Sequence, residues 1–156
     1  MLRRSGPRRR AGGRTGRTHL LAEGVVAVSK KLLVEIVSPE RQVWAGEGDM
    51  VIAKTVEGEI GVQPGHVPVL SLLAHDAVVR VLGARETGEV RVAAHSGFVS
   101  VSGEGRVSIL AEIAELAEDI DVDRARTALQ KAADSGDTLA LGRARSRLRA
   151  AGEEVA

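Results

Sequence analysis

Residues 57–70 read Glu-Gly-Glu-Ile-Gly-Val-Gln-Pro-Gly-His-Val-Pro-Val-Leu, two short apolar runs separated by residues that constrain the backbone. Gly61 and Gly65 permit positive φ or the close approach of another segment, because glycine has no Cβ. Pro64 and Pro68 fix φ and remove a hydrogen-bond donor. The pattern predicts a strand pair interrupted by a rigid turn, at the turn-rich edge of a β-sandwich.

The sequence on both sides of this segment has the period of two that is typical of β-strands. Leu32, Val34 and Ile36 fall on one face of a strand, which Pro39 ends. Further strand-like runs cover residues 49–56, 78–82, 90–94, 97–101 and 106–110. Short strands punctuated by glycine-containing turns predict an antiparallel β-sandwich or barrel over residues 31–118, rather than a parallel sheet with crossover helices.

The pattern changes to a helical period after residue 118. Apolar residues recur at i, i+3, i+7 and i+10 in two successive segments, first at Val122, Ala125, Leu129 and Ala132, then at Leu141, Ala144, Leu148 and Ala151. Ser135-Gly136-Asp137 between them is typical of one helix ending and the next beginning. Residues 119–152 are therefore predicted to form a two-helix hairpin, which makes the fold α+β. Because its stripes are narrow and rich in alanine, we expect weak attachment to the sandwich.

The first 30 residues differ in composition from the rest of the chain. Residues 1–31 hold nine Lys or Arg and one acid, a net charge of +8, whereas the other 125 residues carry −7. We interpret residues 1–30 as a basic disordered extension. An Arg-rich organelle-targeting peptide and an electrostatic contact with nucleic acid remain alternatives.

Composition argues against several classes of function. The chain has no cysteine, one Phe, one Trp and no Tyr, which excludes disulfides and argues against base-stacking nucleic-acid modules. No apolar run reaches the roughly 18 residues of a membrane-spanning helix. The four histidines lack metal-site spacing, and neither a phosphate loop nor a Gly-x-Ser-x-Gly elbow is present. We interpret the acidic cluster at 112–119 as a solvated face, and predict neither catalysis nor a metal site.

Three segments resemble one family. Residues 57–70 closely resemble the loop of ATP synthase epsilon subunits, Gly-Glu-(apolar)-Gly-(apolar)-x-Pro-Gly-His-x-Pro-(apolar)-Leu, at every fixed position. Residues 95–101 are similar to Gly-Gly-Phe-(apolar)-Glu-Val, with Ser96 for the first glycine and Ser100 for the glutamate. Residues 107–114, followed by Ile120-Asp121, are similar to the family's last strand and its exit into the hairpin. The resemblance covers about residues 31–151.

This resemblance implies a rotor component without catalytic activity. Such subunits pair with the gamma shaft, sit on the c-subunit ring and couple proton flow to ATP synthesis at the alpha/beta hexamer. The resemblance places Gly58, Glu59, Ile60 and Gly61 where the sandwich meets the c-ring, with His66 as a further contact in the same loop. The alternatives are an exposed turn carboxylate for Glu59 and a side chain satisfying local backbone groups for His66.

Residues 120–125, Ile-Asp-Val-Asp-Arg-Ala, match a nucleotide-binding signature of some bacterial members of this family. The match implies that Asp121 accepts from adenine or ribose, that Arg124 pairs with phosphate and that Ala125 completes the motif. Lys131 could supply a second cation where the family typically has Arg. In the alternative interpretation, Asp121 only caps the following helix. No cofactor is required, and ATP is the one regulatory ligand expected.

The last predicted helix carries a basic flank formed by Arg143, Arg145, Arg147 and Arg149. Like charges one turn apart repel, so we expect an acidic partner. The resemblance implies that this partner is an acidic segment of the catalytic beta subunit, met when the hairpin extends and restrains ATP hydrolysis. The alternative is a solvated helix face.

A different class of protein is also compatible with the composition, namely a stand-alone β-sandwich binding module whose basic tail contacts nucleic acid or an anionic surface. The acidic body and the lack of aromatics count against it. We therefore expect a peripheral protein at the cytoplasmic face of a bacterial cell membrane, without nucleic-acid binding or direct membrane insertion. Usage rich in Arg, Ala and Gly favours a bacterial over an organellar source, although the basic tail keeps the organellar alternative open.

Overall fold

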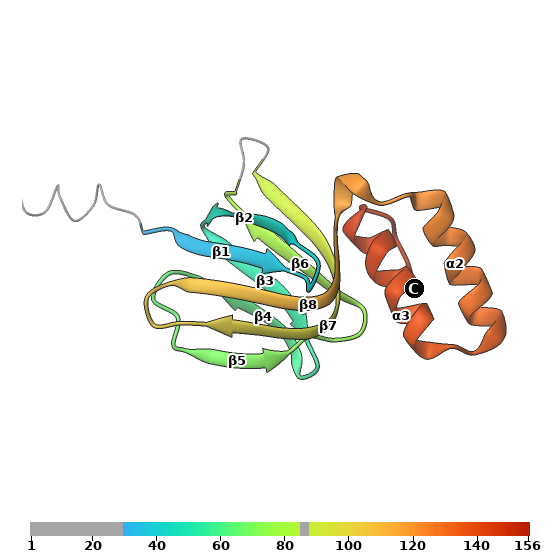
Figure 1. Cartoon of the computed structure of the whole chain (residues 1–156), viewed down its shortest axis with the longest axis horizontal. Coiled ribbons are helices and arrows are strands. Elements are labelled where there is room, and N and C mark those ends of the chain that lie inside the picture. Colours follow the sequence, from blue (N-terminus) through green and yellow to red (C-terminus); the bar gives the residue numbers. More distant parts are fainter. Residues whose placement is uncertain (1–29, 85–87) are drawn as a thin grey trace, which may run out of the picture.

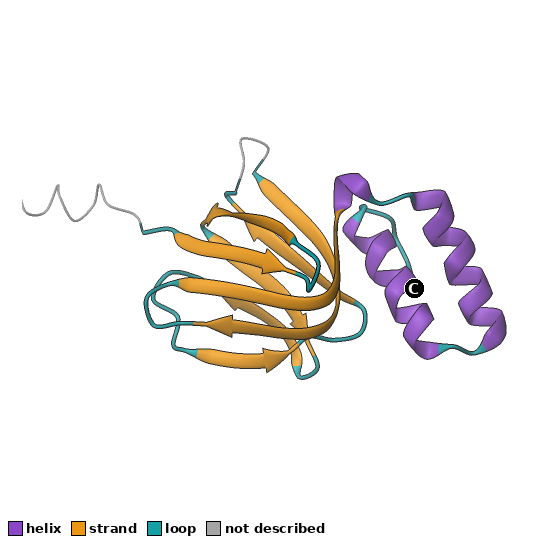
Figure 2. Cartoon of the chain, viewed as in Figure 1, coloured by secondary structure: helices purple, strands orange, loops and turns teal. Residues whose placement is uncertain are grey.

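The computed structural model describes residues 30–84 and 88–156, so most of the predicted basic extension at 1–30 lies outside the described residues. A body of β-strands is followed by two helices at one end of it (Figures 1 and 2). The strands are β1 Leu32–Val37, β2 Gln42–Gly48, β3 Met50–Thr55, β4 Gly58–Val62, β5 Val69–Leu72, β6 Ala77–Leu82, β7 Glu89–Val101 and β8 Arg106–Leu116. A 3-10 helix, η1 Ala117–Asp119, leads to α2 Val122–Ser135 and α3 Thr138–Ala150. The predicted α+β class, a β-sandwich followed by a helical hairpin, is confirmed.

The described strands are hydrogen-bonded in the order β2-β1-β8-β7-β6-β3-β4, and β5 pairs with β7. All of these pairings are antiparallel except that of β1 with β8, which is parallel from Leu33↔Arg106 to Val37↔Leu110. The sequence did not predict this parallel pair, because its two strands are the first and last of the sandwich. Their pairing depends on the path of the whole intervening chain rather than on a local signal.

A bend in β7 lets this strand take part in two different pairings. Its first half pairs with β6 as far as Ala94, and its last residues pair with β5 from Phe98 onward. At the bend, Ser96 and Gly97 have φ of 50° and 148°. A Cβ on Gly97 would lie 1.9 Å from the carbonyl oxygen of Leu110, so only glycine fits. The segments predicted at 90–94 and 97–101 are therefore one bent strand.

The 57–70 segment contains two strands, as predicted, but they do not pair with each other. β4 pairs with β3 and β5 pairs with β7. The prediction of a pair was wrong because the six residues between β4 and β5 carry the chain from one part of the sheet to another. Two other differences are that the sequence did not predict β2 and that β8 continues to Leu116, six residues beyond the predicted end.

The core of the sandwich is built from the buried positions of these alternating strands. Its fully buried side chains are mostly branched aliphatics, which pack well on pleated strands: Leu32, Ile36, Val51, Val62, Val79, Val81, Val92, Val99, Val107 and Ile109. In β3 and β6, buried and half-buried residues alternate along the whole strand. The period of two that predicted the strands thus also marks their inward faces.

The two helices form a hairpin that lies against the end of the sandwich, with α3 between α2 and the strands (Figure 1). Asp121 and Asp137 cap the N-termini by accepting hydrogen bonds from backbone N–H groups, both at 3.0 Å. Gly136, in the left-handed conformation, ends α2. None of the described helices is long and apolar enough to cross a membrane.

Helix α3 is buried on two opposite sides. Ala144 and Leu148 are buried but do not belong to the core of the sandwich, so they face α2. Gly142 and Ser146, half a turn away from them, face the strands: Gly142 lies against His75, and Ser146 bonds the carbonyl of Ala77. The apolar stripe found in the sequence therefore closes the hairpin, whereas small and polar residues attach α3 to the sandwich.

Candidate functional site

The residues predicted to meet the c-ring lie on an exposed edge strand rather than in a loop. Gly58, Glu59, Ile60 and Gly61 belong to β4, which pairs only with β3, and three of them are exposed, Ile60 being half-buried. The turn that precedes them is fixed by Thr55, whose hydroxyl donates to the Gly58 carbonyl at 2.7 Å. The edge thus presents the Glu59 carboxylate on a strand that is hydrogen-bonded to β3.

His66 does not lie in the same loop as Glu59, contrary to the prediction. It follows the far end of β4, and its Nδ1 lies 2.6 Å from the carbonyl oxygen of Val67. Strand residues rise about 3.3 Å each, so the length of β4 separates the two side chains. The contiguous motif in the sequence was misleading because half of it is extended strand.

Glu59 borders a shallow cavity of about 480 Å³ that is lined by basic side chains from several strands and from α3. Its lining includes Lys54, Arg80, Arg91 and Arg149, with Asp76 among them. Asp76 accepts from Lys54 at 2.7 Å and from Arg149 at 2.6 Å. Burial raises the pKa of Asp76, but these two ion pairs outweigh burial and hold that pKa below its usual 3.8.

A row of apolar side chains that the sequence analysis missed runs across one face of the sheet. Leu72 stands opposite Phe98, Phe98 opposite Leu110, and Leu110 opposite Val37. Directly opposed residues share a face of the sheet. Leu72, Phe98 and Leu110 are 60%, 38% and 41% exposed. No local signal marks such a row, because its members come from four strands far apart in the sequence.

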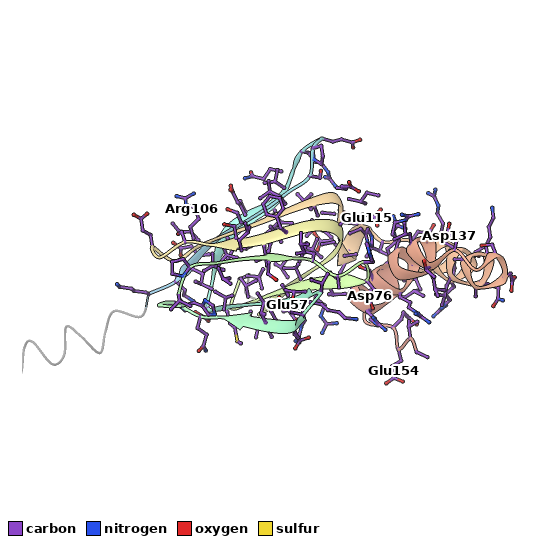
Figure 3. The ribbon with its side chains drawn as sticks, turned by 90° about the horizontal axis from the view of Figure 1, so that it is seen from below. Glu57, Asp76, Arg106, Glu115, Asp137 and Glu154 are labelled. Carbon is purple, nitrogen blue, oxygen red and sulfur yellow. The ribbon has the colours of Figure 1, made fainter. Side chains whose placement is uncertain are left out.

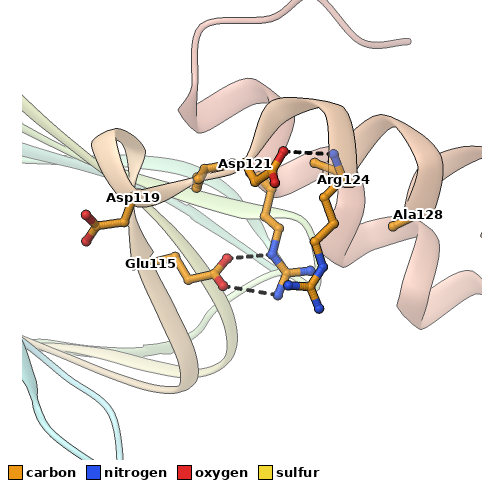
Figure 4. A pocket seen from close by; sticks show the side chains of 8 residues that line it. Glu115, Asp119, Asp121, Arg124 and Ala128 are labelled. Carbon is orange, nitrogen blue, oxygen red and sulfur yellow. Dashed lines mark hydrogen bonds and ion pairs between the residues drawn. The ribbon is translucent and has the colours of Figure 1, made fainter.

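The predicted nucleotide-binding residues border a groove between the sandwich and α2 (Figure 4). The groove has a volume of about 310 Å³, and Asp121, Arg124 and Ala125 line it together with Glu115 and Arg147. Asp121 also caps α2, as the alternative interpretation held. The side chain of Asp121 therefore caps α2 and also borders the groove. Lys131 is not among the lining residues, and the structure does not bring it to this group.

The four arginines of α3 do not form one solvated flank in this conformation. Arg147 donates to both oxygens of Glu115, at 2.5 and 3.5 Å, and Arg149 pairs with Asp76. The Nε of Arg145 is buried without a hydrogen-bond partner, and Arg143 is half-buried. Asp76 and Glu115 both lie at the end of the sandwich nearest the helices, far from Arg106 (Figure 3). The sandwich itself thus supplies acidic partners for two of the arginines.

Within the described residues, no group of three or more His, Asp or Glu side chains is arranged to hold a metal ion. A buried histidine of β7, His95, was not singled out by its sequence context. It lies under α3 between β6 and β8, and only the folded structure reveals its burial.

Comparisons with known proteins agree with this architecture. Residues 31–117 match the family described as ATP synthase, Delta/Epsilon chain, beta-sandwich domain. The ATP synthase epsilon chain of Thermobifida fusca is 68% identical over 136 residues, which cover 84% of this chain and 99% of that relative. The epsilon chain of Streptomyces griseus is 46% identical over 123 residues, covering 79% and 97%.

A chain in the cryo-EM structure of the Euglena gracilis mitochondrial ATP synthase has the same fold, with a TM-score of 0.60 at 21% identity. The match covers 92% of this chain and 84% of that one. Since the bacterial relatives are matched over nearly their full length, both the sandwich and the hairpin are accounted for. The chain therefore belongs to the family of ATP synthase epsilon chains.

Proposed function

We propose that the chain works as a non-catalytic rotor subunit of the F1Fo ATP synthase, coupling proton flow through the c-ring to ATP synthesis. The observation that carries this proposal is the match to epsilon chains over sandwich and hairpin together. A stand-alone binding module is not supported, because the chain has full-length relatives that are subunits of this complex. Its place is peripheral, on the cytoplasmic face of a bacterial cell membrane.

The gamma shaft is the partner proposed for the apolar row of Leu72, Phe98 and Leu110. These side chains are exposed on the sheet, as are Leu33, Leu70 and Ile113, and an apolar stripe of this kind is typical of the centre of an interface. Next to it runs a polar row, in which Ser108 donates to Glu35 at 3.1 Å. An apolar centre with a polar rim is the usual anatomy of a stable contact.

The c-ring contact is proposed at Gly58, Glu59, Ile60 and Gly61 on the edge strand β4. His66 belongs to the same contact only if the interface runs along the whole of β4. The chain has no cysteine, so a single Glu59→Cys can be tested for crosslinking to c-subunits in the assembled complex. Glu47→Cys, also exposed and on β2 at the opposite end of the strand order, is the matched control. Equal crosslinking of both, or of neither, would contradict the assignment.

The hairpin is proposed to restrain ATP hydrolysis when it leaves the sandwich and its four arginines meet the catalytic beta subunit. In the docked state, Arg147 and Arg149 are occupied by Glu115 and Asp76. Two changes should therefore act in opposite directions. Asp76→Asn removes a docking partner without altering the hairpin, and should strengthen the restraint; replacing Arg143, Arg145, Arg147 and Arg149 by Ala should weaken it. If both variants changed the rate of ATP hydrolysis in the same direction, this proposal would be contradicted.

As a second proposal, ATP binds as a regulatory ligand in the groove beside α2. What supports it is that Asp121, Arg124 and Ala125 line one groove of about 310 Å³ with a further cation, Arg147. Arg147 is already paired with Glu115, so phosphate would have to compete for it. Titration with ATP should give saturable binding that Arg124→Ala weakens at least tenfold and Arg106→Ala, at the opposite end of the sandwich, leaves unchanged. Absence of binding at millimolar ATP would remove the proposal.

A further inference from the structure

His95 is a buried histidine whose two ring nitrogens lack a hydrogen bond of normal geometry, although the backbone of His75 is near enough to favour a proton on the ring. Its side chain is 2% exposed and lies in β7, the strand on which α3 packs most closely. Buried polar atoms are usually paired, because an unpaired one loses its hydrogen bonds to water without replacement. The ring is unpaired only in the docked state, because undocking of the hairpin exposes it to water, which can hydrogen-bond to both nitrogens.

The groups around His95 disfavour a proton on its ring. Burial is the largest effect, and the guanidinium groups of Arg147 and Arg143 on α3 act in the same direction. Glu115 on β8 and the backbone of His75 act in the opposite direction, but they are outweighed. The pKa of His95 is lowered from the usual 6.5 to about 4. Most of these influences come from α3, or from the burial that α3 completes.

We propose that His95 is a proton-sensitive switch for the hairpin: a proton on this ring, facing two arginines in a closed interface, releases α3 from the sandwich. The sign follows from linkage. A group whose pKa is lowered by docking favours the docked state above its free pKa and opposes that state as the pH falls below it. Docking thus weakens between about pH 6.5 and pH 4, where a histidine in water takes up its proton. Release itself is independent of the proposed function, and only its consequence for ATP hydrolysis rests on that function.

The hairpin can be followed in the isolated full chain with a single cysteine as reporter. Ala150→Cys places a thiol on α3 beside β7 and β8, at a position that is 1% exposed and takes no part in the hydrogen bond of Ser146. A thiol there reacts only when α3 undocks, so its labelling rate reports the opening equilibrium. Labelling with 4,4′-dithiodipyridine, divided at each pH by the rate of a free thiol, should rise about tenfold from pH 7.5 to pH 5.5, given pKa values of 6.5 free and about 4 docked.

Two variants and a matched control decide the outcome. His95→Leu and His95→Gln cannot titrate, so either folded variant should show nearly constant normalised labelling over this range. His75→Asn removes an exposed histidine of the same interface and should keep the tenfold rise. A flat profile in the parent chain, or a rise that persists in the His95 variants, would overturn the proposal. Because no other subunit is present, neither result bears on the role of the chain in the synthase.

Discussion

The hydroxyl of Ser146 donates a 2.5 Å hydrogen bond to the backbone carbonyl of Ala77, and both residues are completely buried. The bond joins the middle of α3 to the first residue of β6, across 69 positions of sequence. Docking of the hairpin therefore depends on directed polar contacts, since the residues that face the sandwich bring little apolar area. Contacts of this kind are specific in geometry and modest in net free energy.

Loss of this bond should weaken docking measurably. Ser146→Ala leaves the Ala77 carbonyl without its side-chain donor and should cost about 1–2 kcal/mol of docking free energy. A cysteine at the buried position Ala150 would report the change as a roughly 5- to 30-fold faster thiol labelling. Ser135→Ala, whose hydroxyl bonds only within α2 at Ala132, should leave the rate unchanged.

A disulfide can test how α3 sits against the strands. A Cβ on Gly142 would lie 3.4 Å from the Cβ of His75, close to the separation in natural disulfides. His75→Cys combined with Gly142→Cys should form an intramolecular disulfide on mild oxidation, visible by mass, and should hold the hairpin down. His75→Cys with Ala133→Cys, on the outer helix, should remain reduced. Failure of the first pair to oxidise would contradict the docked arrangement.

The apolar row predicts where a charge is least tolerated. Leu72→Asp places a carboxylate at one end of the apolar row, within the proposed gamma contact, and should weaken co-purification with gamma at least tenfold, because a desolvated, unpaired charge is costly. Leu139→Asp introduces the same charge at a residue of α3 with comparable exposure, 48% against 60% for Leu72, and should leave co-purification with gamma unchanged. Equal losses would mean that the row is not the docking surface.

Alanine substitutions at two glycines can distinguish the cost of backbone strain from the cost of steric overlap. Gly58 and Gly97 have similar φ, 135° and 148°, in a region that other residues avoid. Nothing lies within 4 Å of a Cβ on Gly58, so Gly58→Ala should cost about 1–3 kcal/mol. Gly97→Ala adds overlap with the backbone of β8 and should lower the free energy of unfolding by several kcal/mol more, to be measured by urea denaturation. Similar losses for the two variants would show that β7 can relax at its bend.

The sequence predicted those parts of the molecule that depend on neighbouring residues. Alternation predicted the strand at Leu32–Val37, and the cap at Asp121, the alternative interpretation of that residue, comes from a side chain that bonds a backbone group three residues on. What it missed depends on pairing between distant segments: the parallel partners β1 and β8, the separation of Glu59 from His66, and the row from Val37 to Leu72. The burial of His95 belongs to the same class, because α3 is what completes the interface over that strand.

The parallel pairing of β1 with β8 has a mechanical consequence. β8 is hydrogen-bonded to β1 from Arg106 to Leu110 and to β7 along most of its length, and it leads directly through η1 into the hairpin. A force applied through the hairpin first reaches the half of β8 that pairs with β7 alone, and passes from there into the half that is paired on both sides. The hairpin, which we propose moves against the gamma shaft, is therefore attached to a strand whose far half lies in the interior of the sheet rather than at its edge.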